Sequence, residues 1–188
     1  DGSVSYRGRE LSGLRADAIA RLGIVRTFQS PQVFGSFTVR ATCDLVTELS
    51  SSRADANDQL SDRTDEVLAS CGLAAVADLP VAALPYGQLR LLGVATAIAT
   101  RPRMLMLDEP AAGLAPGEAE ALRKVILVAR DRGVSVVVVD HDMSFLLPIC
   151  DSVTVLDGGR KLVEGNPEEV AGDPKVISAY LGESFVER

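Results

Sequence analysis

A run of four apolar residues, 104–107, leads directly into two carboxylates, Asp108 and Glu109. An extended segment of this composition presents apolar side chains on both of its faces. Strands of this kind are typical of parallel sheets that are covered by helices on both sides. The sequence therefore predicts a buried strand that carries two acidic side chains at its carboxyl end.

The segments around this strand repeat the same alternation. Residues 134–139 form a second, mainly apolar run, which leads into Asp140 and His141. Helical patterns precede and follow the first strand, over residues 87–100 and 116–131. Because strands and helices alternate in this way, the sequence predicts an α/β fold built on a parallel sheet.

Shorter elements are expected elsewhere in the chain. Residues 50–57 are the most polar and linker-like stretch, and Thr38 is placed to cap a helix at its N-terminus. We expect strands at residues 3–6, 23–29, 152–156 and 161–164, and helices at residues 15–22, 38–49 and 61–71.

Composition excludes several classes of function. The 188 residues are 47% hydrophobic and carry a net charge of -7, so they suit one compact domain and lack the basic surface that nonspecific nucleic-acid binding needs. His141 is the only histidine, which excludes a metal site built on imidazoles. Cys43, Cys71 and Cys150 lie far apart, and we expect them to be small buried side chains. No segment is long and apolar enough to span a bilayer.

The pair Asp108 and Glu109 carries the clearest chemical signal. Ligands bind at the carboxyl ends of the strands in open parallel sheets. At that edge Asp108 can hold Mg²⁺ directly or through water, and Glu109 can polarise an attacking water. For an isolated acidic pair, solvated side chains in an ordinary turn are the alternative. The apolar run before the pair and Pro110 after it favour the functional interpretation, because together they form a Walker B pattern.

Two further features are compatible with a bound phosphate. His141 follows the neighbouring strand, where an imidazole can bond a phosphate oxygen, and a surface histidine without a function is the alternative. Residues 84–88 form a turn that opens a helix, and helix N-termini attract anions. Gly87 would let the backbone approach a phosphate closely. Taken alone, the turn is a weak signal.

Taken in order, these features resemble the nucleotide-binding domain of ABC transporters over nearly the whole chain. The matching parts are the Q-loop at Gln29, the signature motif at 84–88, Walker B at 105–109, the D-loop at 111–115 and the switch histidine at His141. The ATP-binding subunit of branched-chain amino acid importers is the most similar type, through residues 26–29, 85–88, 108–114, 141–143 and 174–182.

The resemblance implies a P-loop NTPase-type core. In that arrangement a parallel sheet is joined to a helical subdomain that carries the signature motif. The helical subdomain would cover about residues 38–88, the RecA-like core residues 89–165, and C-terminal helices residues 166–188.

The resemblance also implies an ATPase that uses ATP and Mg²⁺. Asp108 and Gln29 would serve the Mg²⁺ ion. Glu109 would orient or deprotonate the attacking water, and His141 would contact the γ-phosphate. Catalysis of this kind rests mostly on positioning and on stabilisation of charge.

Partners follow from the same resemblance. Tyr86, Gly87 and Gln88 of the signature would contact ATP held by a second ABC ATPase subunit, in a homodimer or a heterodimer. The pair would drive transmembrane permease subunits and, indirectly, a periplasmic or extracellular binding protein. Its place would be cytoplasmic, peripheral on the inner face of the cell membrane. No nucleic acid is expected as a partner.

The loop after Gln29 is expected to transmit motion to the permease. Phe34 and Phe37 in this loop offer a docking surface for a coupling helix. The alternative is that both aromatic rings belong to the core of the helical subdomain.

One expected motif is missing. A P-loop needs Gly-Lys followed by Ser or Thr, whose amides and ammonium group hold phosphates. The chain has three lysines, Lys124, Lys161 and Lys175, and none of them follows a glycine. We expect an N-terminally truncated sequence rather than a degenerate, non-hydrolysing relative. These 188 residues alone are then expected to be inactive.

Two positions depart from the family pattern. Pro85 stands where the signature usually has Ser, and Ala115 stands where the D-loop usually has Asp or Asn. Other possibilities stay open: an importer of another substrate, such as urea or a lipid, or an ABC protein of DNA repair or translation. The large insertions of that last class are absent.

Overall fold

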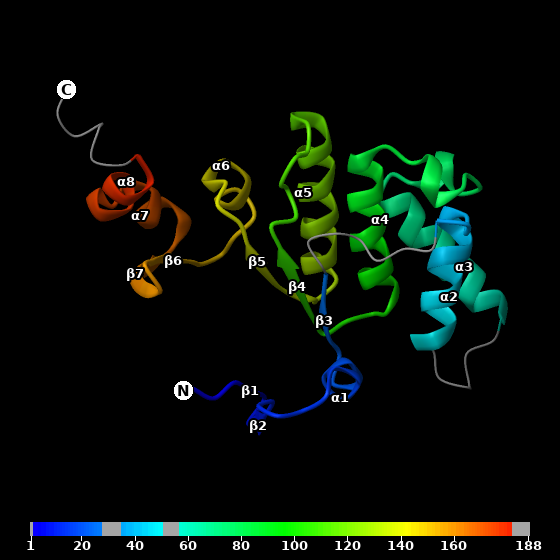
Figure 1. Ribbon diagram of the computed structural model, residues 1–188, viewed down its shortest axis with the longest axis horizontal. Coiled ribbons are helices and arrows are strands. Elements are labelled where there is room, and N and C mark those ends of the chain that lie inside the picture. The colour runs from blue at the N-terminus through cyan, green and yellow to red at the C-terminus, as the bar shows by residue number, and fades with distance from the viewer. Residues whose placement is uncertain (1, 28–34, 51–56, 182–188) are drawn as a thin grey trace. The chain divides into compact units, whose positions relative to one another are not determined.

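The computed structural model describes residues 2–27, 35–50 and 57–181, without the side chains of 57–61 and 180–181 (Figure 1). The chain forms two compact units, Asp1–Asp140 and His141–Arg188, and each is described separately below. No helix among the described residues is long and apolar enough to cross a membrane.

The first unit is built on a three-stranded parallel sheet, in the order β3-β4-β5 (Figure 1). Its strands are β3 (Ile24–Arg26), β4 (Met104–Asp108) and β5 (Ser135–Val139). Asp108, the last residue of β4, pairs with Val139, the last residue of β5. The predicted parallel sheet is therefore confirmed, and two of its strands end at the same edge.

The two faces of this sheet differ in their exposure. Leu105 and Leu107 of β4 are buried on one face. On the other face Val137 and Val139 of β5 are 40% and 60% exposed. The expectation that helices cover both faces is thus met on one face only, within the residues that the structure describes.

Two helices flank the sheet and frame the loop after β4: α4 (Tyr86–Ala99) and α5 (Pro116–Asp131). The buried residues of α5 follow the helical period, at Leu122, Val125, Ile126 and Ala129. Pro116 suits the first turn, where its missing N–H costs no helical hydrogen bond. Both helices match the predicted ranges to within about one residue.

The remaining elements of the first unit lie on either side of β3 along the chain. Thr38 caps the helix that follows it, because its Oγ1 accepts the Ala41 N–H at 3.1 Å, as predicted. These elements are β1 (Ser5–Tyr6), β2 (Arg9–Glu10), α1 (Ala16–Arg21), α2 (Val39–Ser50), α3 (Asn57–Ser70), η1 (Ala74–Val76) and η2 (Val81–Ala83).

The second unit is a hairpin with three helices. Gly158 and Gly159 join its strands with φ of 53° and 77°, the geometry of a two-residue type I′ turn. Val153, Val170 and Val176 form its core. Its elements are α6 (Met143–Leu146), β6 (Val153–Asp157), β7 (Arg160–Gly165), α7 (Pro167–Gly172) and α8 (Pro174–Leu181).

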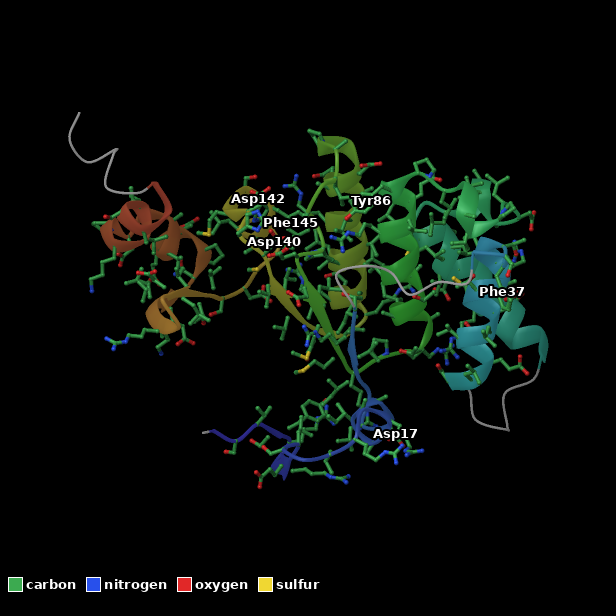
Figure 2. All side chains as sticks on the ribbon, viewed as in Figure 1. Asp17, Phe37, Tyr86, Asp140, Asp142 and Phe145 are labelled. Carbon is green, nitrogen blue, oxygen red and sulfur yellow. The ribbon has the colours of Figure 1, made fainter. Side chains whose placement is uncertain are left out.

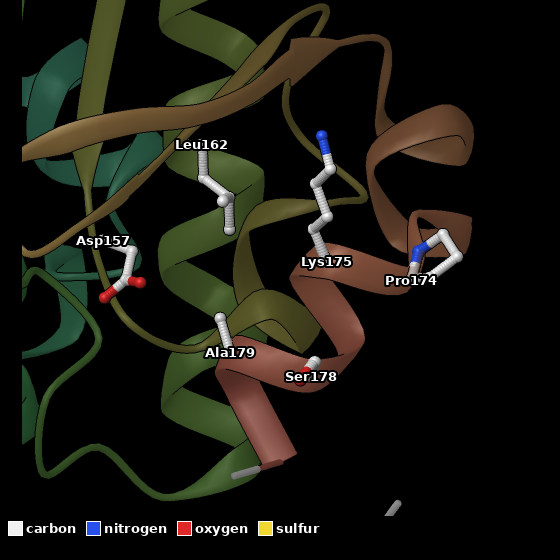
Figure 3. A pocket seen from close by; sticks show the side chains of 6 residues that line it. All are labelled: Asp157, Leu162, Pro174, Lys175, Ser178 and Ala179. Atoms are coloured by element: carbon white, nitrogen blue, oxygen red, sulfur yellow. The ribbon is translucent and has the colours of Figure 1, made fainter. Parts of the chain in front are cut away.

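An open hollow of about 420 Å³ lies on the surface of the second unit (Figure 3). It lies between the hairpin and α8 and is lined by Asp157, Leu162, Pro174, Lys175, Ser178 and Ala179.

Candidate functional site

Asp108 lies at the carboxyl end of β4, as predicted. Its Oδ2 accepts a hydrogen bond from Nη2 of Arg26 at 2.7 Å, so the two side chains form an ion pair. The side chains are 36% and 64% exposed respectively, and an exposed pair of this kind adds little to stability. Asp108 and Arg26 also line a hollow of about 280 Å³ over the open face of the sheet. The carboxylate therefore lies in a cleft that a ligand can enter.

Glu109 occupies an unusual backbone conformation. Its φ is 44°, in the left-handed region that non-glycine residues rarely adopt. Such a conformation costs on the order of 1–3 kcal/mol and persists only where neighbouring groups hold it. The Glu109 N–H donates to the Val139 carbonyl at 2.7 Å, and the Glu109 carbonyl accepts from the Ala112 N–H at 3.2 Å. The strand end thus turns sharply at Glu109, which is where we predict the catalytic carboxylate.

The segment after Glu109, residues 111–115, is held by both neighbouring elements. The Ala111 N–H donates to Oδ2 of Asp140 at 3.3 Å, and Figure 2 shows Asp140 beyond β5. Gly113 adopts a φ of 76°, and a Cβ at this position would approach the Tyr86 ring to 3.3 Å. The predicted D-loop is therefore fixed between the end of β5 and the start of α4.

The predicted signature turn opens α4. The first N–H groups of any helix have no helical carbonyl partner. Pro85 is the N-cap residue of α4, and its side chain does not cap these groups. Gly87 is buried, and a Cβ at this position would lie 2.0 Å from Oε1 of Glu118. Only glycine fits this position without moving the Glu118 carboxylate, whose Oε2 accepts the Ala115 N–H at 2.9 Å. A larger residue at position 87 would therefore displace this flexible side chain of α5.

Arg90 connects this turn to the strand end. Its guanidinium lies 5.5 Å from the centre of the Tyr86 ring, one helical turn earlier, in a cation–π contact. Nη2 of Arg90 donates to the carbonyl oxygens of Glu109 and Ala112 at 3.1 and 3.5 Å. The Tyr86 hydroxyl donates to the same Ala112 carbonyl at 3.4 Å. The structure thus joins three of the predicted motifs through one arginine.

His141 is exposed and is the first residue of the second unit. Asp142 after it caps α6, since its Oδ1 accepts the N–H groups of Ser144 and Phe145 at 2.9 and 3.2 Å (Figure 2). The hydrogen bond from the Ser144 hydroxyl is the main cause that lowers the pKa of Asp142. Because Asp108 belongs to the other unit, the expected meeting of His141 with the acidic pair stays a prediction.

Of the other predicted positions, two lie outside the described residues and two are described. Gln29 and Phe34 lie outside the described residues, so the Q-loop assignment stays a prediction. Phe37 is described and partly exposed, and its role in docking stays a prediction. Gln88 lies in the first turn of α4, partly buried.

Sequence reasoning assigned no role to Arg26, Arg90 or Asp140. One local signal existed for Arg90, because Tyr86 and Arg90 are four residues apart and share one helix face. The partners of Arg26 and Asp140 lie far away in the sequence, so no local pattern could have identified them.

Asp108 is a suitable ligand for a magnesium ion. No group of three or more His, Cys, Asp or Glu residues within the described ranges could hold a metal ion. Mg²⁺ keeps several waters, however, and is commonly held by one or two carboxylates together with substrate phosphates. The Asp108 carboxylate is accessible and paired only across an exposed ion pair, so it fits that arrangement.

Comparison with known proteins decides the family. Residues 1–112 match the family described as "ABC transporter", and residues 160–186 match "Branched-chain amino acid ATP-binding cassette transporter". The chain belongs to the ABC transporter family. This membership confirms the predicted family. The chain is therefore an ABC cassette of the class of ATP-hydrolysing transporter subunits.

Individual relatives agree with this membership. The high-affinity branched-chain amino acid transport ATP-binding protein LivG of Salmonella typhimurium is 37% identical, over 97% of this chain and 77% of LivG. The corresponding protein BraF of Pseudomonas aeruginosa is 36% identical over the same shares. The crystal structure of MJ1267 in its ADP conformation, an ATP-binding cassette of an ABC transporter, superimposes with a TM-score of 0.81 at 26% identity. That match covers 97% of this chain and 78% of MJ1267, which confirms the predicted fold.

Proposed function

We propose that this cassette hydrolyses ATP to drive the import of branched-chain amino acids. The observation that carries the hydrolytic part is the left-handed backbone of Glu109, held at the strand end directly after Asp108. Support for the substrate comes from residues 160–186, which match the branched-chain type of cassette, and from LivG and BraF, which are branched-chain amino acid transport ATP-binding proteins.

The site residues have distinct roles in this proposal. Asp108, with Gln29, would hold Mg²⁺, which neutralises charge on the phosphates when it is bound. Glu109 would orient the attacking water or take its proton, and His141 would contact the γ-phosphate. Arg26 occupies the Asp108 carboxylate in this structure and would have to yield when the ion binds.

The start of α4 would act on a second nucleotide. Its first turn offers N–H groups without helical partners, at Tyr86, Gly87 and Gln88, and a helix N-terminus favours anions. We propose that these groups contact ATP held by a second cassette, in a homodimer or heterodimer that works with transmembrane permease subunits. The cassette would then sit at the cytoplasmic face of the membrane, and Phe37 would contribute to docking.

The hydrolytic role is tested by Glu109→Gln in the complete protein. We expect ATP to bind with unchanged affinity, whereas turnover falls by about 10²- to 10⁴-fold, because the general base is lost. Glu120→Gln is the matched control, since Glu120 lies on α5 in an exposed pair with Arg123 and should leave turnover unchanged. Normal turnover in Glu109→Gln would remove Glu109 from catalysis.

The substrate is tested separately in the reconstituted transporter. We expect ATP-dependent uptake of leucine, isoleucine or valine and no uptake of urea or lipid. Transport of urea or of a lipid instead would overturn the substrate assignment while leaving the ATPase assignment intact.

A further inference from the structure

Arg90 is a buried cation with no place in the roles given above. Its residue is only 6% exposed, although arginine is among the residues least often buried without a specific partner. Its guanidinium reaches out of α4 and donates to the carbonyl of Glu109 at 3.1 Å. Hydrogen bonds from a charged donor are about twice as strong as neutral ones, so this contact orients the peptide that it binds.

The contact falls on the most strained peptide of the site. Glu109 is held at a φ of 44°, and the carbonyl that Arg90 binds belongs to the same residue. The conformation of this backbone decides where the Glu109 side chain points. A shift of about 1 Å in a catalytic group can cost about 10²-fold in rate, so the anchoring of this carbonyl matters for chemistry.

The same arginine is tied to the start of its own helix. Tyr86 stacks against the guanidinium at 5.5 Å, and its hydroxyl shares the Ala112 carbonyl with Arg90. The Tyr86 ring also borders Gly113. A displacement of the first turn of α4 would therefore move Arg90, and with it the Glu109 carbonyl.

We propose that Arg90 is a positioning residue that sets the Glu109 backbone and couples it to the first turn of α4. The inference rests on the proposed function, in which this turn meets the ATP of a second cassette and Glu109 serves the ATP of its own. Arg90 would then link occupancy of one site to the geometry of the other through a single side chain. The buried position suits this role, because water cannot replace the lost donor there.

Arg90→Ala in the complete protein tests the proposal, with Arg63→Ala as the matched control. Arg63 of α3 is 7% exposed and, like Arg90, donates to a backbone carbonyl, but that carbonyl belongs to Ala99 at the far end of α4. Both variants remove a buried arginine that donates to a backbone carbonyl, Arg90 from α4 and Arg63 from α3, so their thermal stabilities should fall alike. Only Arg90→Ala should lower kcat, by about 10- to 100-fold, with KM for ATP changed less than about threefold.

Amide hydrogen exchange without nucleotide gives a second readout. We expect faster exchange across residues 109–113 in Arg90→Ala and no change there in Arg63→Ala. Arg90→Lys keeps the charge but not the forked geometry, so it should recover stability while kcat stays low. It also decides the matter if Arg90→Ala does not fold.

The outcomes separate this inference from the proposed function. If Glu109→Gln abolishes turnover while Arg90→Ala and Arg90→Lys leave kcat and exchange at 109–113 unchanged, the positioning role is wrong and the ATPase assignment stands. If Glu109→Gln turns over normally, Glu109 is not the catalytic carboxylate, and the role proposed for Arg90 is lost with it. If the complete wild-type protein does not hydrolyse ATP, the proposed function itself is wrong. A parallel loss of kcat in Arg63→Ala would reduce Arg90 to a structural residue.

Discussion

Cys43 and Cys71 show how burial alone sets the chemistry of single residues. Both thiols are buried in the first unit and free, as predicted. Burial raises the pKa of Cys43 from 9.0 to about 12, and that of Cys71 from 9.0 to about 11. A thiolate in either position would lie in apolar surroundings, which disfavour the charged form. Between about pH 9 and pH 11 the folded protein therefore keeps two thiol protons that the unfolded chain releases.

This difference predicts a loss of stability at alkaline pH. The thiols contribute fully below the unfolded pKa near 9.0, and their contribution falls as the pH rises toward 11–12, because the unfolded state then binds fewer protons. The free energy of unfolding, measured with urea at about pH 8 and about pH 10, should drop by about 2–3 kcal/mol more in wild type than in Cys43→Ala/Cys71→Ala. Equal drops in both proteins would contradict the burial argument. The double variant also corrects for the tyrosines and lysines that titrate in this range.

Site residues were predictable only where a local sequence pattern identifies them. Asp108 and Glu109 were found because an apolar run ends at them, and Gly87 because it follows a proline at a helix start. Arg90 and Asp140 were missed, because their roles depend on hydrogen bonds with residues 19 and 29 positions away in the sequence. Which polar side chain meets which backbone group depends on tertiary packing.

At the scale of elements, α4 and α5 are in contact where Gly87 of α4 faces Glu118 of α5. The Glu118 carboxylate of α5 lies against Gly87 and accepts the Ala115 N–H, so it caps its own helix while it touches the start of the other. Ala115 has no side-chain acceptor, so Glu118 supplies only half of a capping box.

Gly87→Ala should separate activity from stability. The added Cβ forces Glu118 to rotate and lose its cap bond, which costs about 1 kcal/mol, whereas alanine favours a helix over glycine by about 1 kcal/mol. These effects nearly cancel, so the thermal midpoint should move by less than about 4 °C. ATP hydrolysis by the complete protein should nevertheless fall, because the backbone of the first turn becomes covered.

Glu118→Ala and the double variant Gly87→Ala/Glu118→Ala complete the test. The clash is absent in the double variant, so it should be more stable than Glu118→Ala by about 1 kcal/mol, the helix preference of alanine over glycine. Full activity in Gly87→Ala would show that this part of the turn does not approach a ligand.

The elements themselves were largely predictable. Periodicity located α4, α5 and the strands β4 and β5, since each has a regular apolar pattern that the fold uses. It did not reveal that the valines of β5 differ in solvent exposure, because a run of apolar residues has the same pattern whether one face of the sheet is covered or both. The short turns η1 and η2 also have no periodic signal.

At the scale of the whole molecule, the open face of the sheet and the proposed nucleotide site lie in the same region. Asp108 and Arg26 lie on that face beside the exposed Val137 and Val139, around the hollow of about 280 Å³. The cation now facing Asp108 is Arg26, which cannot replace the amides and lysine of a P-loop.

Residues 1–188 by themselves should therefore bind ATP weakly or not at all. They contain no Gly-Lys-Ser or Gly-Lys-Thr sequence, and the chain spans 77% of LivG. A P-loop supplies most of the contacts to the phosphates, so without one the Kd of MgATP should lie above about 1 mM, at a binding free energy weaker than about 4 kcal/mol. Titration calorimetry with MgATP measures it, with LivG as the positive control. Binding at micromolar Kd would mean that Arg26 and the first turn of α4 can hold the phosphates themselves, and Arg26→Ala would then abolish that binding.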